Sequence, residues 1–246
     1  SPMPELPEVE VTRRELEPRL IGRTIEQVRT TAPSYFFITS PANLRKRLVG
    51  RRAEGLRRLG KYLLLELDGG ARLLLHLGMT GQLFFAGDSS VKLLSSLRGL
   101  SLSPARQRAT TLAEPGFVAD AHTHLTLAFS DGGPALFFRD VRKFGKVEWL
   151  ERDAASARLD RLGIDALGAT GADLYAAARA RSIPIKTLLL DQSVLAGVGN
   201  IYADEALFLA GIHPKRRSKR VSARECDALV TAVQQVMLRS IETGGS

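Results

Sequence analysis

The chain has 246 residues, 44% of them hydrophobic, which is enough to bury the core of one large domain or two small ones. Its 35 lysines and arginines outnumber its 26 aspartates and glutamates, and the resulting net charge of +9 indicates a polyanionic partner. A single cysteine, Cys226, excludes an intrachain disulfide and a cysteine-rich zinc site within this sequence, and the sequence has no apolar run long enough to span a membrane.

The basic residues gather in two runs, Arg45–Lys61 and Lys215–Arg220. Two such runs predict two surfaces that contact phosphate groups. For either run alone, a solvated face is the alternative, and charge does not separate DNA from RNA or from a membrane.

The first predicted element is an amphipathic helix from Leu6 to Leu20. Apolar residues recur there at helical spacing, Pro7 is tolerated in the first turn, and Gly22 follows the end.

Two predicted β-hairpins come next along the chain. Each has two β-like runs around a glycine-containing turn, and a further strand follows at 147–150. The first hairpin has its strands at 62–67 and 72–77, and the second at 124–129 and 135–139. Residues 1–150 are therefore predicted to form a helix and a two-sheet antiparallel β-sandwich.

The stretch 89–120, rich in Ser, Arg and Leu, shows no clear period and is predicted to be a mobile surface insertion. After residue 150 the pattern becomes helical, and the spacing from Ser222 to Glu225 is that of a capping box at the start of the last helix. The helical stretches are 153–180, 185–191, 203–210 and 223–241. The predicted fold class is α+β, with domains at 1–150 and 151–246.

The opening Met3–Glu10 places three carboxylates around a proline at a helix start. The simplest interpretation is a well-capped helix, since negative charge there meets the helix dipole favourably. If Pro4 were the first residue, its secondary amine could instead attack a sugar C1′ and form an iminium, with a nearby carboxylate moving protons.

Three further segments are candidate sites. Met79, between two glycines after an apolar strand, is either a wedge or core filler. The segment 140–145 sets two cations and an aromatic ring before a strand, which suits either filling the gap left by an extruded base or ordinary packing. The glycine turn before Asn200, the predicted N-cap of a helix, is either an anion site or a plain helix-helix turn.

Five motifs in order resemble the formamidopyrimidine-DNA glycosylase / endonuclease VIII family over nearly the whole chain. They are Pro4–Glu10, Gly60–Tyr62, His76–Met79, Arg142–Gly145 and Gly197–Tyr202. The form Leu-Pro-Glu-Val-Glu is closest to the bacterial formamidopyrimidine branch. The resemblance implies a base-excision repair enzyme of the bacterial cytoplasm that removes oxidised purines, such as 8-oxoguanine and formamidopyrimidines, from damaged double-stranded DNA. It also implies cleavage of the resulting abasic site and a helix-two-turn-helix element around Asn200.

The resemblance also implies roles for individual residues. Pro4 matches the N-terminal nucleophile, Glu5 the proton-transferring carboxylate and Glu8 a supporting acid. Lys61 matches a lysine that contacts phosphate and assists the chemistry. The DNA-binding matches are His76, Lys143 and Asn200 as phosphate clamps, Met79, Arg142 and Phe144 as void-filling residues, and Lys186 as a lysine near the lesion.

Two features depart from the family pattern. Ser1-Pro2-Met3 precede Pro4, and an acylated proline nitrogen is a planar amide without an available lone pair, so the chain as written is expected to lack chemistry through Pro4. A cloning remnant and a misplaced start are favoured over a genuine loss of activity. The sequence also ends at Ser246, where the family continues into a four-cysteine zinc finger, so no metal site and no cofactor are expected within it.

The enzyme has two rivals. One is a lesion-binding protein of the same fold without catalysis, and the blocked or free nitrogen of Pro4 separates the two. The other is an RNA-binding module, against which the void-filling set argues because single strands have no void to fill. A monomer without a membrane partner is expected.

Overall fold

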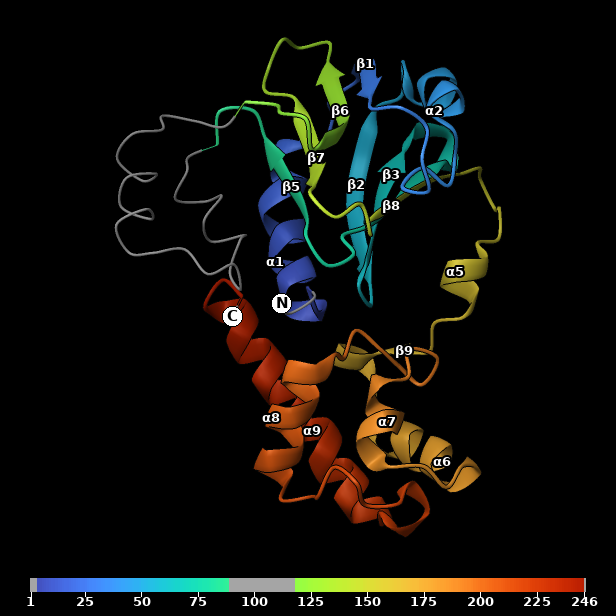
Figure 1. Ribbon diagram of the computed structural model, residues 1–246, viewed down its shortest axis with the longest axis vertical. Coiled ribbons are helices and arrows are strands. Elements are labelled where there is room, and N and C mark those ends of the chain that lie inside the picture. Colours follow the sequence, from blue (N-terminus) through green and yellow to red (C-terminus); the bar gives the residue numbers. More distant parts are fainter. Residues whose placement is uncertain (1–3, 89–117, 246) are drawn as a thin grey trace. The chain divides into compact units, whose positions relative to one another are not determined.

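The computed structural model describes residues 4–88 and 118–245, which form two compact units (Figure 1). The sheet unit comprises Thr12–Arg57 and Tyr62–Ala154. The helical unit comprises Ala155–Ser246 together with two short segments from earlier in the chain, Pro2–Val11 and Arg58–Lys61, as far as these are described. Both short segments are thus grouped with the later helices. The domains expected at 1–150 and 151–246 stay a prediction.

The sheet unit is built on two four-stranded sheets, with strand orders β1-β6-β7-β5 and β2-β3-β4-β8 (Figure 1). The pairings β1–β6, β6–β7, β5–β7, β3–β4 and β4–β8 are all antiparallel. The strands are β1 (Ile25–Thr30), β2 (Ala53–Leu59), β3 (Tyr62–Leu67), β4 (Arg72–His76), β5 (Gly81–Phe85), β6 (Thr123–Phe129), β7 (Leu136–Asp140) and β8 (Lys146–Leu150). Both predicted hairpins and the two-sheet architecture are confirmed.

Helices are few among the described residues of the sheet unit. The predicted first helix is confirmed as α1 (Leu6–Leu16), continued by a 3-10 turn, Glu17–Arg19; its residues after Val11 belong to this unit. The short helix α2 (Pro41–Leu48) begins at the N-cap Ser40, whose hydroxyl accepts a hydrogen bond from the backbone of Asn43. Most of the insertion predicted at 89–120 lies outside the described residues.

Among residues 155–245, four helices have six residues or more: α6 (Gly171–Ala180), α7 (Ile185–Leu190), α8 (Asn200–Ala210) and α9 (Ala223–Glu242). In Figure 1, α8 and α9 lie side by side. The capping box predicted at Ser222 and Glu225 starts α9. Cys226 is a free, buried thiol in the core of the helical unit, and burial raises its pKa to about 11.

The helical stretch predicted at 153–180 is wrong over its first part. That part contains only the four-residue α5 (Ala157–Asp160), the two-residue strand β9 (Ile164–Asp165) and a 3-10 turn, Ala166–Gly168. Strand β9 pairs in parallel with β10 (Leu195–Ala196), which requires extended backbone, and α6 starts only after its own capping box at Thr170 and Asp173. An alanine-rich composition alone did not reveal this interruption.

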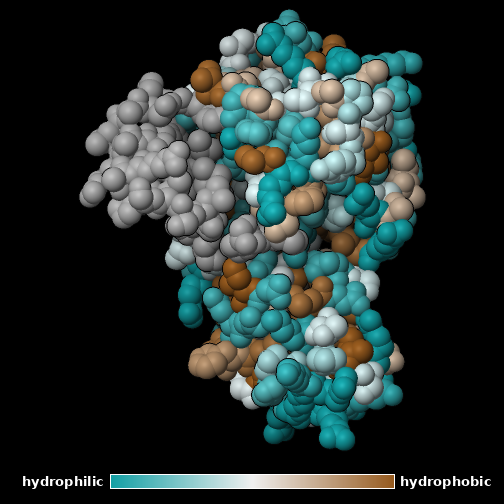
Figure 2. All heavy atoms as spheres, in the orientation of Figure 1, coloured by the Kyte–Doolittle hydropathy of each residue, from teal (hydrophilic) through white to brown (hydrophobic). Residues whose placement is uncertain are grey.

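The surface carries hydrophilic side chains over both units, with apolar residues in smaller patches between them, on the face that Figure 2 shows. Within residues 4–88 and 118–245, no helix is both long and apolar enough to cross a membrane.

Candidate active site

The chain just before α1 is anchored in the core of the helical unit. Leu6 is fully buried there, and its backbone N–H donates to the carbonyl of Gly197 at 3.0 Å. Gly197 has φ of +113°, and a Cβ atom at this position would come within 2.5 Å of the Leu6 side chain. Only glycine therefore allows Leu6 this close approach, which places Glu5 and Pro4 at a defined point.

The Glu5 carboxylate is bound by backbone N–H groups at the start of α8, an arrangement called here the Glu5 seat. Its carboxylate accepts backbone hydrogen bonds from Gly199 at 2.6 Å, Ile201 at 3.0 Å and Tyr202 at 3.4 Å, and the residue is only 3% exposed. Burial raises the pKa of the Glu5 carboxyl, and these N–H groups together with Lys61 only partly offset that rise. The buried acid is thus suited to hold and release a proton.

The same contacts correct the prediction that Asn200 is the N-cap of α8. The N-cap is Gly199, which has no side chain to offer, and Asn200 is the exposed first residue of the helix. The carboxylate of Glu5 satisfies the orphan N–H groups that an N-cap side chain would otherwise bind. The helix receives its cap from a residue 194 positions earlier in the sequence.

Glu8 lies one helical turn after Glu5 and holds the same region in place. Its carboxylate accepts the backbone N–H of Glu5 at 2.9 Å and the hydroxyl of Tyr202 at 2.7 Å. Tyr202 is almost completely buried and also shares a 2.6 Å hydrogen bond with Ser240 of α9. Pro4, which is half-buried, directly precedes this network. Tyr202 and Ser240 were not predicted, although Tyr202 ends one of the motifs.

Lys61 stands in the turn between β2 and β3 and belongs to the helical unit. Burial lowers the pKa of its amine, while the negative charges of Glu5 and Glu8 oppose that change. Burial thus brings the pKa of the Glu5 acid and that of the Lys61 amine closer together.

The predicted residues are divided between the two units. Pro4, Glu5, Glu8, Lys61 and Asn200 belong to the helical unit, as does Lys186, which forms a 2.8 Å ion pair with Asp204 of α8. The residues His76, Met79, Arg142, Lys143 and Phe144 belong to the sheet unit.

In the sheet unit, the loop that contains Gly78 and Met79 packs directly against the loop that contains Phe144. A Cβ atom on Gly78, beside Met79, would lie 2.5 Å from the backbone of Phe144. Met79 is half-buried, whereas Arg142 and Phe144 are exposed and the Arg142 guanidinium lies 5.5 Å from the Phe144 ring. The side chain of Phe144 thus stands free of the core, as a residue that inserts into DNA requires.

The buried carboxylate of Asp140 organises both loops. It accepts the hydroxyl of Thr80 at 2.6 Å and the backbone N–H groups of Arg142 at 3.2 Å and Gly145 at 2.7 Å. Asp140 is fully buried, and sequence patterns did not single it out. Lys143, between these contacts, has φ of +58°. His76, the last residue of β4, accepts the backbone N–H of Gly78 through Nδ1 at 3.1 Å.

The two basic runs are not uniformly solvent-facing. Arg58 of the first run turns inward and binds two carboxylates, and Arg216 of the second run pairs with Glu225. Lys215, Arg217 and Lys219 remain exposed. The phosphate-contacting surfaces predicted from the runs are therefore smaller than the count of cations suggested.

A metal ion does not fit the described residues. No group of three or more His, Cys, Asp and Glu side chains among residues 4–88 and 118–245 could hold one, and Cys226 is enclosed by the core. The family's zinc ion has no ligand set in this part of the chain.

Comparison with known proteins agrees with this architecture. The model of the formamidopyrimidine-DNA glycosylase N-terminal domain matches residues 3–147, and that of the H2TH domain of the same enzyme matches residues 162–246. Both halves thus have the architecture of a DNA glycosylase of the helix-two-turn-helix class.

Relatives match over almost the entire chain. The formamidopyrimidine-DNA glycosylase of Cereibacter sphaeroides is 40% identical over 99% of this chain and 80% of its own length. That of Geobacter metallireducens is 39% identical over 99% and 81%. The crystal structure of the Lactococcus lactis enzyme, bound noncovalently to DNA containing an AP site, has a TM-score of 0.79 and 31% identity, covering 98% of this chain and 83% of that one. The chain belongs to the formamidopyrimidine-DNA glycosylase family.

Proposed function

We propose that this chain is a base-excision repair enzyme that removes oxidised purines, such as 8-oxoguanine and formamidopyrimidines, from duplex DNA and then cleaves the abasic site. The observation that carries the proposal is the buried seat of Glu5 on the start of α8, braced by Glu8 and Tyr202, directly after Pro4. Relatives with this architecture are named formamidopyrimidine-DNA glycosylases.

In the proposed reaction, the nitrogen of Pro4 attacks C1′ of the damaged nucleotide. A bond forms between this nitrogen and C1′, the bond from C1′ to the base breaks, and a proton reaches the departing base or the opening sugar. Glu5 is placed to move that proton, since its pKa is raised by burial. The iminium that forms acidifies C2′, and loss of the C2′ proton expels the 3′ phosphate. A second elimination expels the 5′ phosphate.

This chemistry requires a lone pair on the nitrogen of Pro4. In the printed sequence Ser1-Pro2-Met3 precede Pro4, and a peptide nitrogen shares its lone pair with the neighbouring carbonyl. The active form is therefore the one in which the amine of Pro4 is free.

The remaining predicted residues serve DNA binding in this proposal. Met79, Arg142 and Phe144 fill the space left when the damaged nucleotide leaves the helix, which compensates for part of the lost stacking. The phosphate ligands are His76, Lys143 and Asn200, whereas Lys61 both contacts phosphate and assists the excision chemistry. Lys186 lies near the extruded base. The protein acts as a monomer at the bacterial chromosome, where its substrate lies, and sedimentation of the DNA complex measures the stoichiometry.

Borohydride trapping tests the proposal. The chain as printed and a chain that begins at Pro4 are incubated with duplex DNA carrying 8-oxoguanine or an abasic site, and borohydride reduces any iminium to a stable covalent adduct. An adduct with the Pro4 form alone supports the enzyme and its nucleophile. If neither form is trapped while both bind the lesion, the proposal fails and a lesion-binding protein without catalysis replaces it.

A further inference from the structure

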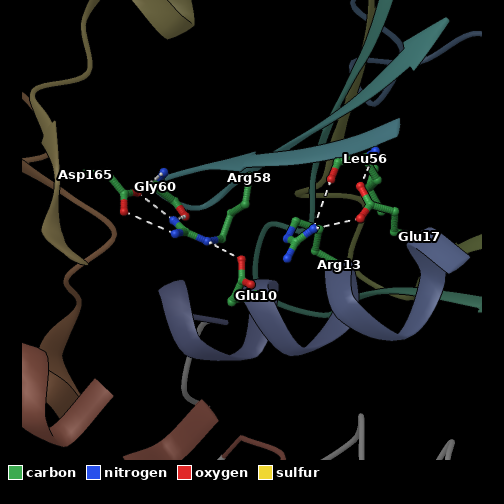
Figure 3. Close-up of polar contacts among 7 residues, drawn as sticks. All are labelled: Glu10, Arg13, Glu17, Leu56, Arg58, Gly60 and Asp165. Carbon is green, nitrogen blue, oxygen red and sulfur yellow. Dashed lines mark hydrogen bonds and ion pairs between the residues drawn. The ribbon is translucent and has the colours of Figure 1, made fainter. Parts of the chain in front are cut away.

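Arg58 is a buried arginine held between two carboxylates of the helical unit (Figure 3). Its Nε atom lies 2.9 Å from Glu10 on α1, and its Nη1 and Nη2 atoms lie 2.5 Å and 3.1 Å from the two oxygens of Asp165 on β9. The side chains of Arg58 and Glu10 are only 9% and 8% exposed. A guanidinium removed from water to this degree needs both partners.

Arg58 and Asp165 also form hydrogen bonds with the backbone of Gly60, one position before Lys61. Nη1 of Arg58 donates to the carbonyl of Gly60 at 3.1 Å, and the N–H of Gly60 donates to Asp165 at 2.8 Å. Both polar backbone groups of this residue are therefore fixed. Gly60 has φ of +57°, and a Cβ atom here would lie 2.9 Å from the side chain of Ala196 on β10. The turn that presents Lys61 thus has little freedom.

Asp165 links this turn to the seat of Glu5 through a very small sheet. Strand β9, which carries Asp165, pairs with β10, and β10 leads within a few residues to Gly199, whose N–H holds the Glu5 carboxylate. The segment after β9 is in turn fixed to α9, because the amide of Gln234 donates to the carbonyls of Ala166 and Ala169. One connected set of contacts therefore supports both Glu5 and the turn that carries Lys61.

An apolar cluster of similar volume would stabilise such a turn equally well, since desolvation offsets much of what a buried ion pair contributes. Charge and directional hydrogen bonds, in contrast, fix a backbone at one position. The arrangement is therefore better explained by the need to place the next side chain.

We infer that Asp165 is a positioning residue that, through Arg58 and Gly60, holds the amine of Lys61 beside the carboxylates of Glu5 and Glu8. The inference rests on the proposed function, because it assigns Lys61 to the excision chemistry. The Lys61 amine is shielded from water, and this burial lowers its pKa.

The test is a double-mutant cycle of Asp165→Asn and Lys61→Ala in the form that begins at Pro4. Asparagine keeps an oxygen for the N–H of Gly60 but loses the charge that Arg58 requires. We measure single-turnover excision of 8-oxoguanine and binding to duplex DNA with an uncleavable abasic analogue. Asp165→Asn should slow excision about 10-fold to 100-fold when Lys61 is present, the range expected from a displacement of roughly 1 Å. With Lys61→Ala, the further loss should be less than about 2-fold.

Glu17→Gln is the matched control. Glu17 accepts Arg13 at 3.2 Å and the backbone N–H of Leu56 at 2.8 Å, so it joins α1 to the same strand β2 within the sheet unit (Figure 3). It makes the same kind of contact without touching the lysine turn, and its excision rate should stay within about 2-fold of the parent. Arg58→Lys keeps the positive charge but loses the planar guanidinium that binds both carboxylates. It should slow excision to the same degree as Asp165→Asn, and it serves as the test variant if Asp165→Asn does not fold.

Each outcome assigns the failure to one proposal. If the parent neither excises nor traps, the proposed function is wrong. If the parent excises but Asp165→Asn slows the reaction equally with and without Lys61, the residue acts only on the fold and the positioning inference is wrong. The inference is also wrong if Lys61→Ala leaves excision unchanged, because no lysine then needs positioning.

Discussion

Gly199 is the most informative single position in the Glu5 seat. Its backbone is extended, with φ of −121°, so alanine can adopt this conformation without strain. A Cβ atom there would nevertheless lie 2.5 Å from Cδ and 2.8 Å from Oε1 of Glu5. The substitution Gly199→Ala therefore acts on one neighbouring side chain and not on the conformation of its own residue.

The size of the effect follows from these distances. Carbon atoms in contact prefer about 3.5–4.0 Å, so the carboxylate must retreat by roughly 1 Å. That movement stretches the 2.6 Å bond from the N–H of Gly199 beyond hydrogen-bonding range. Loss of a hydrogen bond to a charged group costs about 1.5–3 kcal/mol of stability, and misplacing a reacting group by about 1 Å slows a reaction about 100-fold.

The assay is single-turnover excision of 8-oxoguanine by the form that begins at Pro4, with thermal unfolding measured in parallel. Gly168→Ala is the control, because a Cβ atom at Gly168 meets nothing within 4 Å and this residue also belongs to the helical unit. We expect about 100-fold slower excision for Gly199→Ala and no change for Gly168→Ala. If Gly199→Ala folds and excises within about 3-fold of the parent, the placement of Glu5 does not govern the chemistry.

Two further variants separate binding from stability. Phe144→Ala should change the free energy of unfolding by no more than about 0.5 kcal/mol, since the residue is 46% exposed. It should nevertheless weaken binding to a lesion duplex about 10-fold through lost stacking, measured by fluorescence anisotropy against an undamaged duplex. Equal weakening on both duplexes would contradict a void-filling role. Lys61→Met should raise the free energy of unfolding at pH 7, because burial lowers the pKa of Lys61 below its ordinary value of 10.5 and so disfavours the charged amine in the folded state. The parent then gains stability as pH rises through the lowered pKa, so denaturant titrations should show the difference shrinking toward pH 10.5, and a difference that does not change with pH would refute this account.

Local patterns were sufficient for much of the fold. Turn glycines between apolar runs predicted both hairpins, and the spacing of Ser222 and Glu225 predicted the start of α9. These signals depend on neighbours a few residues apart. Strands β1, β2 and β5 were not predicted, because they lack such a turn signal or a clear alternation.

The sequence predicted individual candidate residues of the site but not the contacts between them. The opening acids were identified, but not the partners of Glu5 and Glu8, since the N–H groups of α8 and the hydroxyl of Tyr202 lie nearly 200 residues away along the chain. Arg58 was assigned to a basic surface for the same reason, because its partner Asp165 is 107 positions distant. A pattern within one segment contains no information about a partner of this kind.

The distance between Glu5 and its seat also has a consequence for biosynthesis. Glu5 is synthesised early, but the backbone N–H group of Gly199 that receives its carboxylate is made 194 residues later. Joining ends this far apart has an entropic cost of about 5 kcal/mol, which only the completed helical core can offset. A chain that ends before α8 therefore lacks the N–H groups that hold the Glu5 carboxylate, so this contact forms only once translation has passed the start of α8.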